Sequence, residues 1–402
     1  MLTRRSVAAS LLGVSALALG GCVGGLSGSR GTAQAEPPPP APGPAPVAST
    51  GPTIGAGSVK VGLILPLTGA GQGAAAAASL RNAAELALAE FQGPDLTLLV
   101  KDDRGTADGA REAASQALAE GAELIIGPLF APSVQAVGQV ARQAGKPVIA
   151  FSTDASVAAR GVYLLSFLAQ TDVDRIVDFA VSRGKRSFAA LIPETVYGNV
   201  AEAQFREAAA RRGARVVAIE RYASGQPQAA VGRVASLVAG ASPQADALFV
   251  PDNADGLPAV AQALTQAGFN PQRVTPFGTG VWNDPRLFRI GALQGGWFAA
   301  PDKAGFDAFA GRYRARYGAD PTRIATLSYD AVSLAAALVR TQGSQRFAEG
   351  AIANPSGFAG ADGVFRFRTD GLNERSLAVL EIRNGATAVA SPAPRALTGS
   401  GA

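Results

Sequence analysis

Residues 59–65 read Val-Lys-Val-Gly-Leu-Ile-Leu, an apolar and β-branched run that ends at Pro66. A helical pattern follows at 79–91, and a second apolar run follows at 96–101. Continuous apolar runs are typical of strands covered on both faces, and their alternation with helices favours parallel strands joined by right-handed crossovers. This stretch therefore predicts an α/β fold.

The same alternation continues far along the chain. Further apolar runs, expected as strands, lie at 123–126, 147–151, 187–192, 215–219 and 247–250. Helical patterns lie between them at 107–118, 133–144, 172–183, 201–212 and 257–267. Seven strand–helix units are more than we expect in a single sheet, and the pattern restarts near 166–172. We therefore expect two doubly wound parallel-sheet lobes.

The C-terminal third has a different pattern. Helical segments at 306–317 and 323–339 precede two apolar runs, 363–368 and 376–382, which predict a β-hairpin. If the helices pack on the first lobe and the hairpin closes the second, the chain crosses between the lobes three times, which is the topology of a hinge. We expect a first lobe of 58–168 plus 300–355 and a second of 169–299 plus 356–390.

The N-terminus has the pattern of an export signal over residues 1–21. Arg4 and Arg5 precede an apolar run at 7–19, which is too short to span a bilayer. Leu19-Gly-Gly-Cys22 looks like a lipobox, and Cys22 is the single cysteine of the chain. We expect a lipid on Cys22 to hold the protein on a membrane, with inner or outer membrane and general or twin-arginine export left open.

Residues 22–57 and 391–402 are rich in Gly, Ala, Ser and Pro, with four consecutive prolines at 37–40. Such composition buries little apolar surface, so we expect a semi-stiff tether before the folded part and a flexible tail after it. The formal net charge of +5 includes Arg4 and Arg5 of the expected signal. The remaining excess is too small to indicate nucleic-acid binding.

The composition argues against an enzyme. The chain has no histidine, and its one cysteine is expected to carry lipid. Imidazole bases, Ser-His-Asp or Cys-His arrangements and histidine-ligated metals are therefore ruled out by the sequence. The carboxylate pair Asp102-Asp103 follows an expected strand and favours turn and cap chemistry. We predict no catalytic residue, no metal and no cofactor.

Polar or small residues follow several of the expected strands. In open α/β sheets, ligands bind beyond the carboxyl ends of strands, where helix N-termini offer free N–H groups. Each such residue alone is more often a helix cap than a ligand group. Together they predict the two sides of one cleft, lined by Ser133, Ser152, Thr153, Tyr197, Asn253 and Thr279.

Several short segments follow one another in a recognisable order: Lys60-Val-Gly-Leu-Ile-Leu-Pro-Leu-Thr-Gly, Ile126-Gly-Pro, Pro147-Val-Ile-Ala-Phe-Ser-Thr, Tyr197-Gly, Tyr313-Arg-Ala-Arg-Tyr-Gly and Tyr329-Asp-Ala. In this order they resemble the type I periplasmic binding proteins of the leucine/isoleucine/valine-binding kind, and the resemblance covers about residues 58–390. It implies two lobes, a three-crossover hinge and a solute-binding role beside an ABC permease.

The resemblance also implies roles for individual residues. Ser152 and Thr153, with Ser133 nearby, would hold an amino-acid carboxylate, and Tyr197 would lie in the cleft. Gln72 falls at a position where this family usually has an aromatic residue, and Asn253 falls near another such position. At Thr279 amino-acid binders usually place an acid for the ligand ammonium, and a buried ammonium without a partner is costly. An amino-acid ligand would then need Asp154, Asp252 or Asp255 instead.

Two functions remain open at this stage. The first is capture of a small polar ligand, such as an amino acid, for an ABC permease. The second is a partner-binding regulator, because Gly295-Gly-Trp-Phe-Ala-Ala-Pro301, the lipobox and the tether are also similar to lipoproteins that activate penicillin-binding proteins. Such an activator would bind a peptidoglycan synthase. Both place the protein in the periplasm on a lipid anchor.

Overall fold

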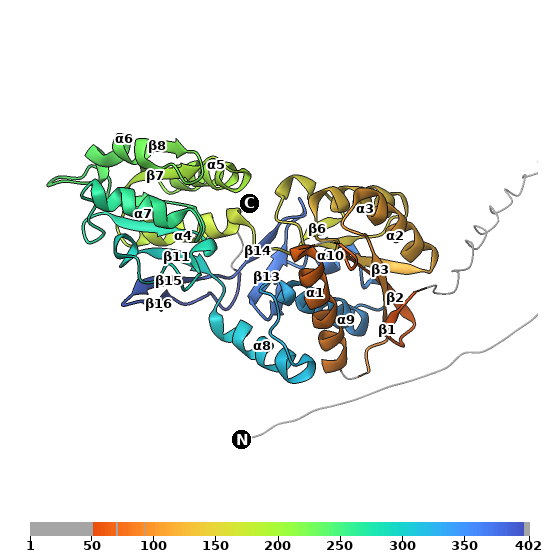
Figure 1. Ribbon diagram of the computed structural model, residues 1–402. Helices are drawn as coiled ribbons and strands as arrows, with labels where there is room; N and C mark the ends of the chain where they lie inside the picture. Colours follow the sequence, from red (N-terminus) through yellow and green to blue (C-terminus); the bar gives the residue numbers. More distant parts are fainter. Residues whose placement is uncertain (1–50, 70, 92, 398–402) are drawn as a thin grey trace, which may run out of the picture. The chain divides into compact units, whose positions relative to one another are not determined.

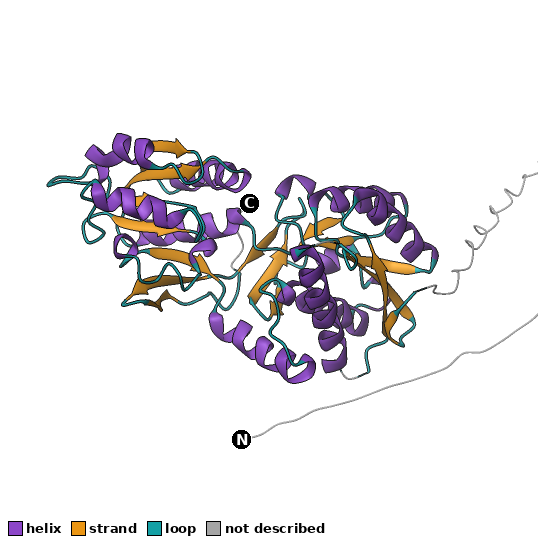
Figure 2. Cartoon of the chain, viewed as in Figure 1, coloured by secondary structure: helices purple, strands orange, loops and turns teal. Residues whose placement is uncertain are grey.

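The computed structural model describes residues 51–69, 71–91 and 93–397 (Figure 1). The expected export signal, Cys22 and most of the expected tether lie outside these residues. Helices flank the strands of two separate sheets (Figure 2). Across the parts of the chain that the structure describes, no helix combines the length and apolar character that crossing a membrane requires.

The first lobe contains a six-stranded sheet in the order β1-β3-β2-β4-β5-β6. All neighbouring strands in it are parallel except the pair β1 and β3. Its elements are β1 (Thr53–Gly55), β2 (Val59–Leu65), α1 (Gln72–Glu90), β3 (Leu96–Asp102), α2 (Ala107–Ala119), β4 (Ala122–Ile126), α3 (Ala131–Gln143), β5 (Val148–Ala150), η1 (Ala155–Val157) and β6 (Val162–Leu164). The β1 pairing extends the folded part into the expected tether, since Thr53–Gly55 hydrogen-bonds to β3.

The second lobe contains a seven-stranded sheet in the order β16-β15-β11-β10-β9-β7-β8. Its elements are α4 (Ala169–Ser182), β7 (Ser187–Pro193), α5 (Val196–Arg211), β8 (Arg215–Tyr222), α6 (Gln228–Val238), β9 (Ala247–Phe249), α7 (Leu257–Gln266), β10 (Thr275–Gly278), η2 (Gly280–Trp282), η3 (Gly291–Leu293), β11 (Trp297–Ala300), β15 (Ala378–Arg383) and β16 (Ala386–Ser391). Phe205 of α5 stacks on Phe249 of β9 with ring centroids 4.7 Å apart, which fixes this helix on the sheet.

The remaining elements pack against the core of the first lobe. They are α8 (Lys303–Tyr317), α9 (Ala325–Thr341), η4 (Gly343–Gln345), α10 (Glu349–Ile352), β12 (Phe358–Gly360), β13 (Gly363–Phe367) and β14 (Asn373–Arg375). Leu327 and Leu334 of α9, together with Phe365 and Phe367 of β13, share a buried cluster with strands β2 to β4. The chain therefore passes between the two cores three times, after β6, after β11 and after β14.

The expected hairpin of 363–368 and 376–382 does not form. Strand β13 pairs instead with β12 and β14 in a separate three-stranded sheet, whereas β15 pairs with β11 and β16. The third crossing separates the two segments, so 358–375 packs with the first lobe and not with the second as expected. The apolar alternation was correct for strands, but it carries no information on which strands pair.

Residues of the expected flexible tail also make contacts. Arg175 of α4 donates to Ser391 Oγ at 2.8 Å, and Ser376 donates to the carbonyl of Pro394. Arg366 of β13 donates to the carbonyl of Leu397 at 3.3 Å. Residues 391–397 therefore lie against α4 and the three-stranded sheet, held by side chains that the tail's own composition could not reveal.

Helices α3 and α4 end in the same way. Gly145 and Gly184 both have positive φ, 64° and 84°, a conformation that favours glycine. The next residue in each case, Lys146 or Lys185, donates its N–H to a carbonyl in the last turn of the helix, at 2.9 and 3.1 Å. The sequence pattern Gly-Lys thus ends a helix shortly before the next strand begins in each lobe.

Candidate functional site

Tyr197 and Thr279 meet at the carboxyl ends of the strands in the second lobe. Tyr197 lies in the first turn of α5, directly after β7, and Thr279 follows β10. Their hydroxyl oxygens are 2.6 Å apart, so one donates to the other. Thr279 is fully buried, and burial raises the pKa of Tyr197, which keeps its phenol protonated. The structure thus brings together two residues that were each predicted from the sequence as cleft residues, without a contact between them.

Asp172 joins this pair and was not among the expected site residues. It lies in the first turn of α4, and its Oδ2 accepts the N–H of Gly280 at 2.9 Å. Burial raises the pKa of Asp172 to about 7, against smaller lowering effects of the Gly280 N–H and of Arg375. Its charge also raises the pKa of Tyr197, whose hydroxyl partner Thr279 directly precedes Gly280 in the chain. One sequence feature could have indicated Asp172: it is an acidic residue in the first turn of α4, the helix that follows the first passage between the lobes.

The three aspartates considered as substitutes for the missing acid have other partners. Asp252 accepts from the Tyr222 hydroxyl at 2.7 Å. Asp255 pairs with Arg286 at 2.9 Å, and Asp154 accepts the N–H of Ser156 at 2.9 Å. The acid beside Thr279 is therefore Asp172, because the fold carries the start of α4 to the end of β10.

Ser152 and Thr153 follow β5 in the first lobe. Ser152 is 4% exposed, and its Oγ accepts the N–H of Asp154 at 3.1 Å, whereas Thr153 is exposed. The N–H of Phe151 donates to the carbonyl of Pro128 at 3.0 Å, which ties this segment to the segment after β4. Thr153 is thus held on a loop that is braced from both ends.

The remaining expected ligand residues have structural partners or lie outside the description. Ser133 is fully buried in α3 and donates to the carbonyl of Thr106 at 3.3 Å. Asn253 Oδ1 accepts the N–H groups of Asp255 and Gly256, a turn that leads into α7. Gln72 is the first residue of α1, and its side chain is outside the described part of the structure.

The Asp102-Asp103 pair forms the turn hydrogen bonds that its position predicts. Asp102 Oδ1 accepts the N–H of Arg104 at 2.9 Å, and Asp103 Oδ1 accepts the N–H of Gly105 at 2.8 Å. Burial raises the pKa of Asp103. Within residues 51–69, 71–91 and 93–397, no group of three or more His, Cys, Asp or Glu residues is placed to hold a metal ion.

Three solved structures share this fold. A protein from Rhodospirillum rubrum, described as a branched-chain amino acid ABC transporter, is 22% identical at a TM-score of 0.73, with 82% of this chain and 99% of that chain covered. A solute binding protein of an ABC transporter from R. palustris, in complex with benzoate, is 20% identical at a TM-score of 0.58, with coverage of 86% and 98%. A branched-chain amino acid transporter substrate binding protein from Streptococcus pneumoniae, in complex with isoleucine, is 19% identical at 0.56, with coverage of 83% and 99%.

No curated protein sequence matches this chain. The family model described as periplasmic binding protein matches residues 58–387, which run from β2 to the start of β16 and include all three passages between the two cores. With its two doubly wound lobes, the chain belongs to the periplasmic binding protein family.

Proposed function

We propose that this protein is a lipid-anchored extracytoplasmic solute-binding protein that captures an amino-acid-like ligand between its lobes and presents it to an ABC permease. The observation that carries the proposal is the group formed by Asp172, Tyr197 and Thr279 at the strand ends of the second lobe. It combines an acid and hydroxyl groups, which suit a ligand that carries an ammonium group.

Asp172 supports an amino-acid ligand because it supplies the charge that Thr279 cannot. Oδ2 accepts the Gly280 N–H, and Oδ1 forms no hydrogen bond to another described residue. A pKa of about 7 leaves the carboxyl group divided between its two forms near neutral pH. A ligand ammonium would favour the ionised form, since an opposite charge nearby lowers the pKa of a carboxyl group.

The first lobe would hold the other end of the ligand. Thr153 is exposed on a braced loop after β5, next to Ser152, in a position suited to a ligand carboxylate. The similar structures that contain isoleucine or benzoate both hold a small carboxylate, which agrees with this assignment. The expected lipid on Cys22 would keep the protein at the periplasmic face of a membrane.

The second candidate, a regulator that binds a peptidoglycan synthase, was inferred from the segment 295–301, the lipobox and the tether, and the lack of an acid at Thr279 also favoured it. Asp172 lies beside Thr279 and removes this last argument, so we favour solute capture. Calorimetry of the full chain with leucine tests the choice: we expect saturable heat that is lost in Thr153→Ala and weakened in Asp172→Asn. Lys185→Gln, a change at the far end of the same lobe, is the control and should bind normally.

Equal binding by Thr153→Ala and the unchanged chain would contradict the assigned first-lobe contact. A screen in which neither amino acids nor aromatic carboxylates produce any heat, together with capture of a peptidoglycan synthase by the full chain, would favour the regulator.

A further inference from the structure

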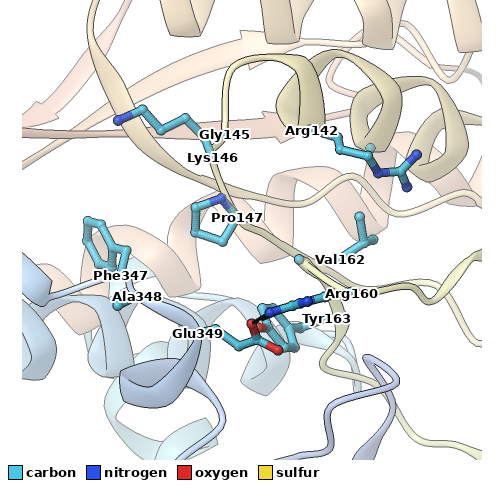
Figure 3. A pocket seen from close by; sticks show the side chains of 12 residues that line it. Arg142, Gly145, Lys146, Pro147, Arg160, Val162, Tyr163, Phe347, Ala348 and Glu349 are labelled. Atoms are coloured by element: carbon cyan, nitrogen blue, oxygen red, sulfur yellow. Dashed lines mark hydrogen bonds and ion pairs between the residues drawn. The ribbon is translucent and has the colours of Figure 1, made fainter.

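The cations that belong to the first lobe differ in how far solvent reaches them. Around the cavity of about 280 Å³ where β5 and β6 begin, the Lys146 and Arg142 side chains point away in opposite directions (Figure 3). Arg160, on the facing wall, has an 82% exposed side chain that pairs with Glu349 at 2.7 Å. The Arg375 side chain, at the end of β14, is only 2% exposed. The charge of Arg375 must therefore be balanced inside the protein.

Two aromatic rings contact the Arg375 guanidinium group. Its Cζ lies 5.2 Å from the ring centroid of Phe167 and 5.5 Å from that of Phe365. The negative face of an aromatic ring attracts such a cation. Phe167 lies between β6 and α4, in the first passage between the two cores, and Arg375 directly precedes the third passage. The guanidinium group is thus held in the hinge.

The pairing of Arg375 with an acid of the first lobe is loose. Its Nε, Nη1 and Nη2 are buried, and none of them hydrogen-bonds to a residue that the structure describes. Nη1 lies 3.7 Å from Asp330 Oδ2, which is beyond hydrogen-bond distance. Burial raises the pKa of Asp330 to about 7, so this acid is only partly ionised near neutral pH. Asp330 alone therefore balances only part of the positive charge.

The second acid near this charge is Asp172 of the proposed solute site. Thr171, its neighbour in α4, donates its hydroxyl to the carbonyl of Asn373 in β14 at 3.3 Å. The N–H of Asp172 itself donates to the carbonyl of Leu168, in the first passage, at 3.3 Å. Burial raises the pKa of Asp172, and the charge of Arg375 is among the effects that lower it.

Other charged groups on α4 and on the elements packed against it have partners of their own. The pairs are Asp174 with Arg211, Asp178 with Arg212, Glu202 with Arg221, Glu374 with Arg366 and Glu381 with Arg383, and Arg175 donates to the carbonyl of Leu377. Strands β10 and β11 contain no ionisable side chain, and Tyr197 of α5 stays protonated. Among the groups named here, Arg375 is the cation without a hydrogen-bond partner.

We propose that Arg375 is a positioning residue of the solute site, which is held in the hinge by Phe167 and Phe365 and keeps the Asp172 carboxylate available to a ligand ammonium. The purpose of this residue rests on the proposed function, because the ammonium belongs to the proposed ligand. An opposite charge nearby favours the ionised form of a carboxyl group. The acid of the second lobe thus depends on a cation that contacts the core of the first.

The test is a carbon NMR titration of the ligand-free full chain, with aspartate labelled at the carboxyl carbon. The Asp172 signal is identified by its absence in Asp172→Asn, and its midpoint should lie near pH 7 in the unchanged chain. Arg375→Gln should raise this midpoint by about one pH unit. Arg375→Lys keeps the positive charge and should restore most of the shift, which a purely structural role would not explain.

Arg323→Gln is the matched control. Arg323 contacts the same Phe167 ring at 4.6 Å, but Asp362 balances its charge through two hydrogen bonds of 2.9 and 2.7 Å. This variant should leave the Asp172 midpoint unchanged. If Arg375→Gln does not fold, Asp330→Asn gives a test in the opposite direction, because removing the acid beside Arg375 should lower the midpoint.

An Asp172 midpoint that stays the same in Arg375→Gln would overturn the proposal, and so would an equal rise in Arg323→Gln. Calorimetry with leucine at pH 7 should show about fivefold weaker binding by Arg375→Gln, since a one-unit rise leaves about a tenth of the carboxyl group ionised instead of half. If the midpoint shifts but leucine gives no heat with the unchanged chain, the proposed function fails and the link between Arg375 and Asp172 stands. Normal leucine binding with an unshifted midpoint would overturn the role of Arg375 alone.

Discussion

The loop after β5 in the first lobe and the strand ends β7 and β10 of the second lobe use their polar side chains differently. In the first lobe, Ser152 bonds to a backbone group two residues away, and Asp154 does the same. In the second lobe, Tyr197 bonds to Thr279, 82 positions along the chain, and Asp172 bonds to Gly280, 108 positions along. Local bonds shape a single loop, whereas these long-range bonds join α4, α5 and the end of β10. The second lobe therefore presents a fixed polar group, and the first lobe presents a braced loop.

Both lobes also contain the same helix cap, a threonine followed three residues later by a glycine, so matched substitutions can be made in the two lobes. Thr106 caps α2 by accepting the N–H of Gly109 at 3.0 Å, and Thr195 caps α5 by accepting the N–H of Gly198 at 2.9 Å. In both cases the glycine lies against the backbone at the end of the preceding strand. A Cβ at Gly109 would lie 2.3 Å from the Asp103 carbonyl oxygen, and one at Gly198 would lie 2.0 Å from that of Pro193.

The largest effect is expected from Gly198→Ala and Gly109→Ala. Each added methyl group overlaps backbone that cannot rotate away, so each variant should lower the free energy of unfolding by about 3 kcal/mol. Urea denaturation measures the loss. Gly198→Ala should also disturb leucine binding, because the strained turn carries Tyr197, whereas Gly109→Ala should affect stability more than binding.

The control is Gly232→Ala in α6, where an added Cβ meets no atom within 4 Å. There the usual helix preference applies, and the variant should be more stable by about 0.5–1 kcal/mol. A loss of stability at Gly232 equal to that at Gly198 would show that the close approach is not the cause.

A smaller effect is expected from Tyr197→Phe. The change leaves the Thr279 hydroxyl buried without its partner, which should cost about 1–2 kcal/mol of unfolding free energy. Adding Thr279→Val removes the unpaired hydroxyl and should recover part of that loss, as a double-mutant cycle in urea would show. Ser152→Ala removes only a local bond in the first lobe and should cost less. Strictly additive effects of the Tyr197 and Thr279 changes would contradict a direct bond.

The smallest effect concerns the pH dependence of stability. The pKa of Asp172 is about 7 in the folded protein and about 3.8 ordinarily, so the folded state holds the proton more tightly. Stability from this group is present at low pH and is lost as the pH rises through 7. Asp172→Asn should therefore gain stability relative to the unchanged chain as the pH rises from 5 to 8, because the unchanged chain loses the contribution of the protonated carboxyl group.

Burial also raises the pKa of Asp330 to about 7. Asp330 is present in both the Asp172→Asn variant and the unchanged chain, so the difference between their unfolding free energies reports on Asp172. Denaturation curves at the two pH values give this difference. A constant gap between variant and unchanged chain would mean that Asp172 is ionised throughout.

Much of the fold follows from patterns within short segments. The run 59–65 predicts a buried strand, and β2 spans Val59–Leu65. Alternation with helices predicts two doubly wound sheets, and both are present. The pairing of the last strands was not predictable in this way, because the runs at 363–368 and 376–382 suit a hairpin as well as two separate sheets.

In the candidate site too, individual residues could be predicted from the sequence, but the contacts between them could not. Tyr197 and Thr279 could be named from the sequence because each follows a strand, but their contact could not. Asp172 was missed because it lies at the start of a helix, where an acid usually signifies a favourable charge near the N-terminus. Its position beside Gly280 depends on how α4 packs against the second sheet.

The sequence by itself determined most of the longer strands and helices and the lack of imidazole chemistry, since each depends on residues close together in the chain or on composition alone. Only the tertiary structure decided that Asp172 joins Tyr197 and Thr279 and that 358–375 packs with the first lobe. The physical reason is that these contacts join segments far apart in the chain, and their energies depend on burial and distance, which no local pattern encodes.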